Sequence, residues 1–284
     1  MITFAKRNLL LFFRDKSAVF FSLLAVLIII GLYALFLGDV WMEDLPEIKD
    51  AETLMDSWLI AGLMAVTTVT STMGAFGIMV EDRAKKTNMD FYAAPVKRRS
   101  ITGGYFASAY IIGIIMSLIT FVFSELYILM NGGELLGAVS MFKVFLLILL
   151  SAATNTALVS FIVSFFYSQN AFAAASTIIG TLIGFITGIY LPIGTLPETV
   201  QFFIKIFPVS HAAVLFRQII MEKPLNVSFS NIQADYVNQF KESMGVTYQF
   251  GGETLTPLLS ILILTASAIL FYGLTILNLS RKRK

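Results

Sequence analysis

Residues 144–197 read VFLLILLSAATNTALVSFIVSFFYSQNAFAAASTIIGTLIGFITGIYLPIGTLP, and no side chain in these 54 positions is charged. As one α-helix this stretch would be roughly 80 Å long, whereas about 20 residues cross the hydrocarbon core of a membrane. We therefore expect a break at the polar cluster of residues 167–170. The break divides the stretch into two membrane spans, 144–166 and 171–190.

Four further apolar stretches lie on either side of this one. They cover residues 17–37, 57–80, 101–130 and 257–279, and the only charge among them is Glu125. Each is long enough to span a bilayer as a helix. The sequence thus predicts an all-α membrane protein in which residues 17–284 form one domain of six transmembrane helices.

The composition supports this class and excludes several others. Hydrophobic residues make up 57% of the chain and charged residues 13%, with a mean hydropathy of +0.82. Soluble domains carry about 25% charged residues, so a soluble globular domain, a disordered chain and a nucleic-acid-binding protein are all disfavoured.

The chemistry that the sequence lacks narrows the function further. There is no cysteine, His211 is the only histidine, and no Gly-Lys pair forms a phosphate-binding GxxxxGK[ST] loop. We expect no catalytic residue, no metal site and no cofactor bound by this chain.

The basic residues predict the orientation. Fourteen of the 20 Lys and Arg residues lie in three segments, 1–16, 81–100 and 281–284, whereas residues 38–56 carry seven acids and one lysine. Lys and Arg concentrate in cytoplasmic loops. We therefore expect both termini in the cytoplasm, in a multi-pass plasma-membrane protein of the bacterial cytoplasmic-membrane type.

Two cytoplasmic segments stand out. Residues 1–16 place Phe and Leu among basic residues, which predicts an amphipathic helix in the membrane interface. Residues 81–100 read EDRAKKTNMDFYAAPVKRRS, where Pro95 stops a short charged helix near Ala94. The residues alone fit either a protein-contact helix or a solvated loop that fixes the topology.

The external region 191–256 begins with prolines. Pro197 and Pro208 bound two short apolar segments, 198–207 and 210–221, which are too short to span the membrane. We expect them to be re-entrant helices. Residues 222–256 are polar and predict an external cap with one amphipathic helix.

Polar residues on the second, third and fourth predicted spans form the candidate translocation path: Thr67, Thr70, Ser71, Glu125 and Asn155. The alternative is that these groups serve helix packing. For Glu125, near the outer end of its span, the alternatives are pairing with a loop and reaching the outer headgroups. Glu125 is the only ionisable group in a span, so coupling to protons or sodium is weakly supported. We expect the energy for any transport to come from another subunit.

Three segments together resemble one known family. FAKRNLLLFFRDK precedes the first span, VEDRAKKTNMDFYAAPVKRRSITGGY follows the second, and LPIGTLPETVQFFIKIFPVSHAAVLFRQIIM precedes the last. This order resembles the membrane permease subunits of type-2 ATP-binding-cassette exporters, including daunorubicin-resistance-like multidrug exporters. Family members often carry Gly just before the Thr of the second motif, where this chain has Lys86.

The resemblance implies a mechanism with separate ATPase subunits. Two permeases, identical or related, associate with cytoplasmic nucleotide-binding subunits, which bind ATP and Mg²⁺. The resemblance assigns ATPase coupling to Glu81, Asp82, Arg83, Thr87, Asp90, Phe91, Tyr92, Pro95 and Arg98. It assigns the elbow to Arg7, Phe12, Phe13 and Arg14, and the outer gate to Pro197, Pro208, His211 and Arg217.

The Phe-rich, charge-poor spans favour an amphiphilic cargo, namely a drug, an antimicrobial or a lipid, moved outward by alternating access. Export of a polysaccharide or teichoic-acid chain is the alternative within the family. It is less favoured because Trp41 and Trp58 lie near the outer boundary and provide no aromatic lining at mid-membrane. From another class, the chain is a non-ABC channel or sensor.

Overall fold

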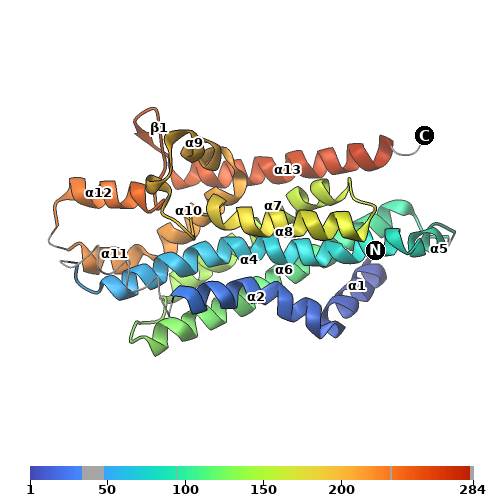
Figure 1. Ribbon diagram of the computed structural model, residues 1–284, viewed down its shortest axis with the longest axis horizontal. Helices are drawn as coiled ribbons and strands as arrows, with labels where there is room; N and C mark the ends of the chain where they lie inside the picture. The colour runs from blue at the N-terminus through green and yellow to red at the C-terminus, as the bar shows by residue number, and fades with distance from the viewer. Residues whose placement is uncertain (34–47, 94, 231, 282–284) are drawn as a thin grey trace.

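The computed structural model describes residues 1–33, 48–93, 95–230 and 232–281. Long helices run side by side along the long axis of the molecule, and shorter helices gather at its two ends (Figure 1). The long helices are α2 (Lys16–Leu32), α4 (Ala51–Ala84), α6 (Arg98–Met130), α7 (Ala138–Val163), α8 (Gln169–Ile186) and α13 (Pro257–Arg281).

The all-α class is confirmed, and the described structure contains five to seven candidate membrane-spanning helices. Five of the described helices are long and apolar enough to cross a membrane: α4, α6, α7, α8 and α13. Two bent pairs add to them. α1 (Ile2–Arg14) meets α2 at 75°, and α9 (Glu198–Ile206) meets α10 (Pro208–Ile220) at 88°. The first pair forms the expected elbow and span, and the second is a re-entrant pair.

α4 is the central helix of the bundle. It packs against α6, α7, α8, α10 and α2, and nearly all of its side chains from Leu54 to Val80 are buried. By contrast, only 17% of the most apolar 18-residue segment is buried in each of α8 and α13. Their apolar faces are therefore left uncovered by this chain.

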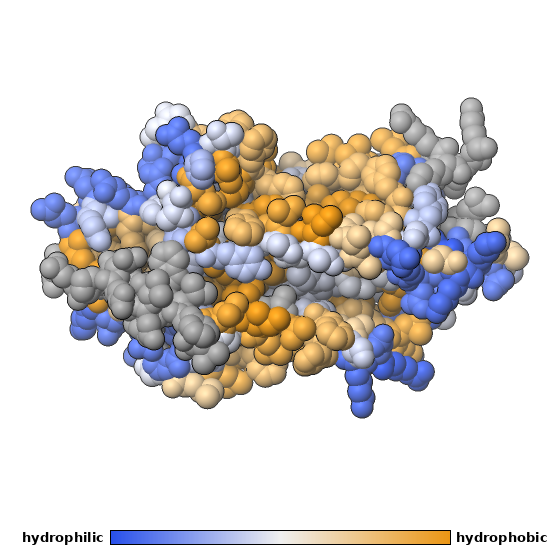
Figure 2. All heavy atoms as spheres, viewed as in Figure 1, coloured by the Kyte–Doolittle hydropathy of each residue, from blue (hydrophilic) through white to orange (hydrophobic). Residues whose placement is uncertain are grey.

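The two ends of the molecule differ from its middle. A broad apolar band crosses the middle, and hydrophilic residues gather at both ends (Figure 2). The N-terminus, α5 (Thr87–Ala93) and the end of α13 lie at one end (Figure 1). We call this the inner end, because it carries the basic segments that predict the cytoplasmic side.

The opposite, outer end carries the region expected to be external. It contains η2 (Ile193–Thr195), the re-entrant pair, α11 (Glu222–Ser228) and α12 (Ala234–Ser243). A small antiparallel pair, β1 (Gln249–Phe250) and β2 (Glu253–Thr254), precedes α13. The expected amphipathic helix of the cap corresponds to α12.

The length of α4 departs from the expected boundaries. It begins before the apolar stretch, so that Glu52 and Asp56 are helical, and it continues through Glu81, Asp82 and Arg83. Those last three residues therefore lie on α4 and not on the short helix that follows. Asp50 lies just before α4, whereas the other acids of the first connection, and Trp41, fall within 34–47 and lie outside the described residues.

Candidate coupling and gating sites

A bidentate ion pair joins the elbow to the central helix at the inner end. Arg7 on α1 donates from Nη1 to Asp82 Oδ2 at 2.8 Å and from Nη2 to Asp82 Oδ1 at 2.9 Å. Tyr105 on α6 donates its hydroxyl to Asp82 Oδ2 at 2.6 Å. Asp82 is buried, whereas the Arg7 side chain keeps 32% of its surface exposed. We call these three residues the inner clasp.

Asp82 stabilises the charged form of Arg7. The hydrogen bond with Asp82 is the main reason that the pKa of Arg7 rises above its already high ordinary value. Paired, planar hydrogen bonds of this kind are stronger than neutral ones. The adjacent Asn8 is buried and donates to Ser108 Oγ on α6 at 3.3 Å, which adds a second link from α1 to α6.

The elbow can approach α6 closely because α6 has two glycines there. A Cβ at Gly104 would lie 2.7 Å from Phe4 Cδ1, and a Cβ at Gly103 would lie 3.0 Å from Met1 Sδ. Phe4 also packs edge-to-face on Tyr105, with the ring centroids 5.0 Å apart. The first turns of α1 thus lie directly over the clasp.

Phe91 connects the short helix α5 to this assembly. Its ring packs edge-to-face on Phe4 at 5.0 Å, and the Arg7 guanidinium lies 4.9 Å from its centroid. The opposite side of α5 is free of such contacts in the described structure: Met89 and Asp90 are exposed. α5 therefore has one anchored face and one face turned to solvent.

The chain enters α5 through a left-handed residue. Lys86 has φ 60°, between the end of α4 and Thr87. This conformation favours glycine, the residue that the family resemblance led us to expect just before Thr87. Lys85, one residue earlier, forms an exposed pair with Glu81 at 2.5 Å, and this hydrogen bond raises the pKa of Lys85.

Arg83 has a different environment from its neighbours in the motif. It donates to the carbonyls of Val163 and Phe166, both at 3.2 Å, and its guanidinium lies 5.5 Å from the Tyr167 ring. It thus caps the end of α7, where helix carbonyls lack partners within the helix.

A second arginine organises the outer end. Arg217 on α10 is fully buried and donates from Nη2 to the carbonyls of Thr187 at 2.8 Å and Gly188 at 3.2 Å. Its Nη1 reaches the carbonyl of Gly245 at 3.4 Å, and its guanidinium lies 4.9 Å from the Trp58 ring. We call this group the outer anchor.

The outer anchor contains no carboxylate. Among the described residues, Arg217 forms no ion pair, and its Nε has no hydrogen-bond partner. It sits at the C-terminus of α8, whose dipole favours a positive charge. Burial raises the pKa of nearby Tyr248 to about 12, so that phenol stays neutral at physiological pH.

His211 joins the two halves of the re-entrant pair to the last helix. Its Nε2 lies 2.9 Å from the carbonyl of Lys205, and its Nδ1 lies 3.1 Å from Ser260 Oγ on α13. Ser210 donates to the carbonyl of Ile204 at 2.6 Å, which closes the bend between α9 and α10. The bend is therefore held by two side chains of α10, Ser210 and His211, which bond to the backbone of α9.

A comparison with models of protein families identifies the family of this chain. The model of the ABC-2 type transporter family matches residues 1–221, which include the elbow, the clasp, α5 and the re-entrant pair. The chain belongs to the ABC-2 type transporter family. It is the membrane permease subunit of such a transporter, and ATP is bound and hydrolysed on a partner ATPase subunit. No curated protein matches the chain.

Within this ABC-2 permease, the remaining coupling and elbow residues are dispersed. Thr87 is partly buried, and Pro95 is exposed. Phe12 is buried against α4, whereas Phe13 and Arg14 are exposed. The side chains of Tyr92 and Arg98 lie outside the described residues.

The candidate path residues of the permease lie largely inside the bundle. Thr67 and Ser71 are fully buried, and Asn155 donates to Thr68 Oγ1 at 2.6 Å, linking α7 to α4. Glu125 is 6% exposed and accepts the Leu136 N–H at 3.0 Å. Thr70 alone is partly exposed.

The candidate outer-gate residues do not form one cluster. Pro197 is exposed at the start of α9, whereas Pro208 is the buried first residue of α10. Sequence reasoning missed Trp58, Tyr105 and Phe4 as partners. The signal that existed for Trp58 was the lone arginine of an apolar segment, which needs a partner when it is buried.

Proposed function

We propose that α5 is the coupling helix of this permease and that the inner clasp transmits its movement. The observation that carries the proposal is the position of Phe91, whose ring contacts both the Phe4 ring and the Arg7 guanidinium. A push on the exposed face of α5 therefore reaches Arg7 directly. From Arg7 it passes to Asp82 on the central helix.

The clasp is built to open. Arg7 is partly exposed, so water can solvate its guanidinium when the pair separates. The break between α4 and α5 at Lys86 allows α5 to rotate without bending α4. ATP-driven closure of the ATPase subunits would thus shift the elbow relative to α4, and two permease chains would alternate between inward and outward access.

A groove beside the clasp is our candidate for the site where cargo enters. A cavity of about 530 Å³ lies between α1, α4 and the start of α8, with Leu11, Phe12 and Ile78 on its apolar side. Five charged side chains also line it: Arg7, Asp15, Glu81, Asp82 and Lys85. Gly74 is exposed in a helix that is otherwise nearly all buried, so it leaves the groove open.

This lining favours an amphiphilic cargo, such as a drug, an antimicrobial or a lipid, over a long sugar chain. Sites of this size suit molecules with an apolar body and a few polar groups. The uncovered apolar faces of α8 and α13 leave surface for a second permease, identical or related, and for lipid.

The coupling role can be tested by changing one exposed methionine. Met89→Glu adds a charge to the free face of α5, and Met130→Glu makes the same change at the outer end of α6. After purification in mild detergent, we expect Met89→Glu to lose its ATPase partner, as counted by mass spectrometry, whereas Met130→Glu retains it. Equal ATPase recovery in both variants would contradict the role of α5.

The cargo proposal needs a separate test. Gly74→Leu fills the groove next to Phe12, whereas Gly180→Leu adds the same side chain on α8 where no atom lies within 4 Å of the new Cβ. We expect Gly74→Leu to abolish the stimulation of ATPase activity by amphiphiles while the complex and its basal activity remain. Stimulation equal to that of Gly180→Leu would rule out this groove.

A further inference from the structure

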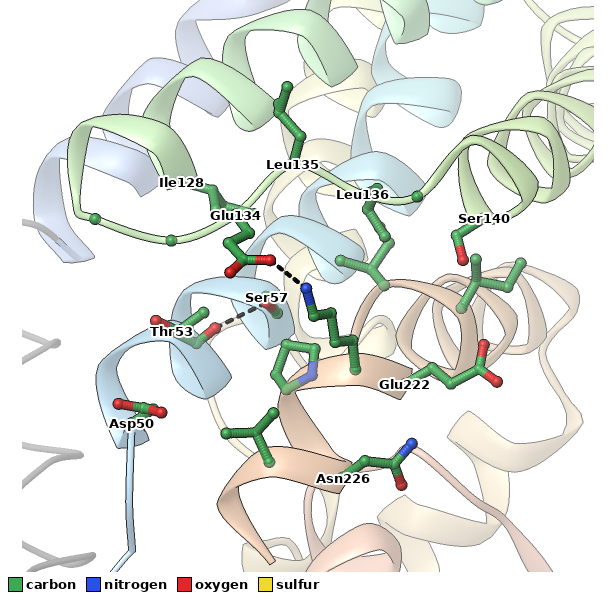
Figure 3. Close-up of a pocket in the computed structure, with 18 residues that line it drawn as sticks. Asp50, Thr53, Ser57, Ile128, Glu134, Leu135, Leu136, Ser140, Glu222 and Asn226 are labelled. Carbon is green, nitrogen blue, oxygen red and sulfur yellow. Dashed lines mark hydrogen bonds and ion pairs between the residues drawn. The ribbon is translucent and has the colours of Figure 1, made fainter. Parts of the chain in front are cut away.

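A second cavity lies at the outer end, opposite the groove. Its volume is about 640 Å³, and it is bounded by the start of α4, the connection between α6 and α7, and α11. In Figure 3, Asp50 lies just before α4 and Thr53 and Ser57 lie on it, Leu135 and Leu136 come from the connection, and Glu222 and Asn226 come from α11. This volume is typical of small-molecule sites.

The cavity has apolar walls. Ile128, Leu136, Ile220 and Pro224 contribute to them, from three different parts of the chain. An apolar wall of this extent suits a ligand with a hydrophobic body. It does not by itself select a charge.

The wall formed by the α6–α7 connection is held in place. Gly132 has φ 80°, and a Cβ at Gly133 would lie 2.5 Å from Ile128 Cγ2, so the backbone packs directly on the end of α6. The Leu136 N–H donates to the buried Glu125 Oε2 at 3.0 Å. The cavity is thus formed before any ligand binds.

Its charged groups are unbalanced. Asp50, Glu134 and Glu222 line the cavity with a single lysine, Lys223, which is paired with Glu134. Asp50 is exposed, and Glu222 meets only Lys143 at 3.9 Å, where both side chains are at least half exposed. Glu125 lies behind the wall, and its Oε1 has no partner among the described residues. Asp50, Glu134, Glu222 and Lys223 together give the described lining a net negative charge, and a concave surface of net negative charge concentrates cations.

We propose that this outer cavity binds an amphiphilic organic cation from the side expected to be external. The apolar walls would hold the hydrophobic body, and Asp50 and Glu222 would face the cationic group. This is a site distinct from the inner groove, and it does not depend on the groove carrying cargo.

The test measures binding of tritiated tetraphenylphosphonium to the purified permease in nanodiscs of zwitterionic lipid. The variant Asp50→Asn/Glu222→Gln removes two carboxylates that are exposed, and Asn is well tolerated at the left-handed Asp50. Glu253→Gln, on the exposed β2 strand outside the cavity, is the matched control.

We expect saturable binding to the wild type and to Glu253→Gln, and about tenfold weaker binding to the double variant. The neutral probe triphenylphosphine oxide should not distinguish the three proteins. Equal affinity of the double variant and the wild type for the cation, or no saturable binding, would overturn the proposal. Gly74→Leu should leave this binding unchanged, so a failure here is distinguishable from a failure of the inner groove.

Discussion

Arg7 at the inner end and Arg217 at the outer end both hold neighbouring helices together, but their partners differ. Arg7 is paired with a carboxylate and remains partly exposed. Arg217 is fully buried and bonds only to backbone carbonyls, beside the Trp58 ring. When the inner pair separates, water can hydrate Arg7 and the buried Asp82 keeps the hydrogen bond from Tyr105, whereas the fully buried Arg217 would lose its hydrogen bonds without gaining water.

The difference assigns separate tasks to the two ends. The inner clasp lies beside the helix that we propose meets the ATPase, and it can open and close. The outer anchor fixes the end of α8, the re-entrant helix α10 and the cap to one another. Four sets of variants test whether the two ends have these separate roles.

Removing Arg217 should destabilise the permease most. Arg217→Leu leaves the carbonyls of Thr187 and Gly188 without this donor inside the protein, and we expect the free energy of unfolding to fall by about 3 kcal/mol or more. Thermal unfolding in detergent measures it. Arg14→Gln, at an exposed arginine of α1, should leave the midpoint unchanged. Similar midpoints for both variants would show that Arg217 is no anchor.

The inner clasp should show energetic coupling between its two charged residues. We expect a double-mutant cycle of Arg7→Ala and Asp82→Ala to give an interaction free energy of about 1–3 kcal/mol. Either single substitution already removes both charged hydrogen bonds of the pair, so the second substitution cannot remove them again. Both single variants should also lose ATPase stimulation by cargo. If the two single substitutions lower the free energy of unfolding by amounts that simply add in the double variant, Arg7 and Asp82 do not act as a unit.

Displacing the elbow should uncouple transport with a smaller effect on stability. The Cβ of Gly104→Ala would meet Phe4 at 2.7 Å, so the first turns of α1 must move away from the clasp. We expect reduced ATPase stimulation by amphiphiles in the reconstituted complex. Gly103→Ala is the control, because its Cβ meets only the flexible end of Met1. Equal stimulation of ATPase activity by amphiphiles in Gly104→Ala and Gly103→Ala would contradict this role of the elbow.

The smallest effect concerns the break before α5. Lys86→Gly relieves a left-handed conformation and should raise the free energy of unfolding by about 1 kcal/mol. Lys85→Gly, at a right-handed position, should lower it. Slower hydrogen exchange in α5 of Lys86→Gly would support the reading, and faster exchange would contradict it.

Much of the fold could be predicted because hydropathy shows which segments lie in the membrane and which lie in water. The uncharged stretch 144–197 required a break, and α7 and α8 meet at 164–168, beside the expected cluster. The three basic segments indicated one side of the membrane, and the N-terminus, α5 and the end of α13 share one end. These features depend on local composition alone.

The sites were harder to predict because they depend on tertiary contacts. Glu81, Asp82 and Arg83 are consecutive, yet Asp82 turns inward to Arg7, Arg83 caps α7 and Glu81 stays near solvent. A helix rotates about 100° per residue, so neighbours in a motif face different partners. In the same way, hydropathy cannot show that Thr67 and Ser71 are enclosed by neighbouring helices.

The most direct test of the central claim measures movement at both ends in one protein. The chain has no cysteine, so spin labels can be attached to introduced pairs without background. Ile2→Cys with Ala84→Cys reports on the elbow and the inner end of α4, and Leu191→Cys with Tyr236→Cys reports on the outer end near α8 and α12. Distances are compared in the ATPase complex without nucleotide and after trapping with ATP and vanadate. We expect the distance between the two inner labels to change on trapping, while the distance between the two outer labels stays constant. A constant inner distance together with a changing outer distance would contradict the roles of the inner clasp and the outer anchor.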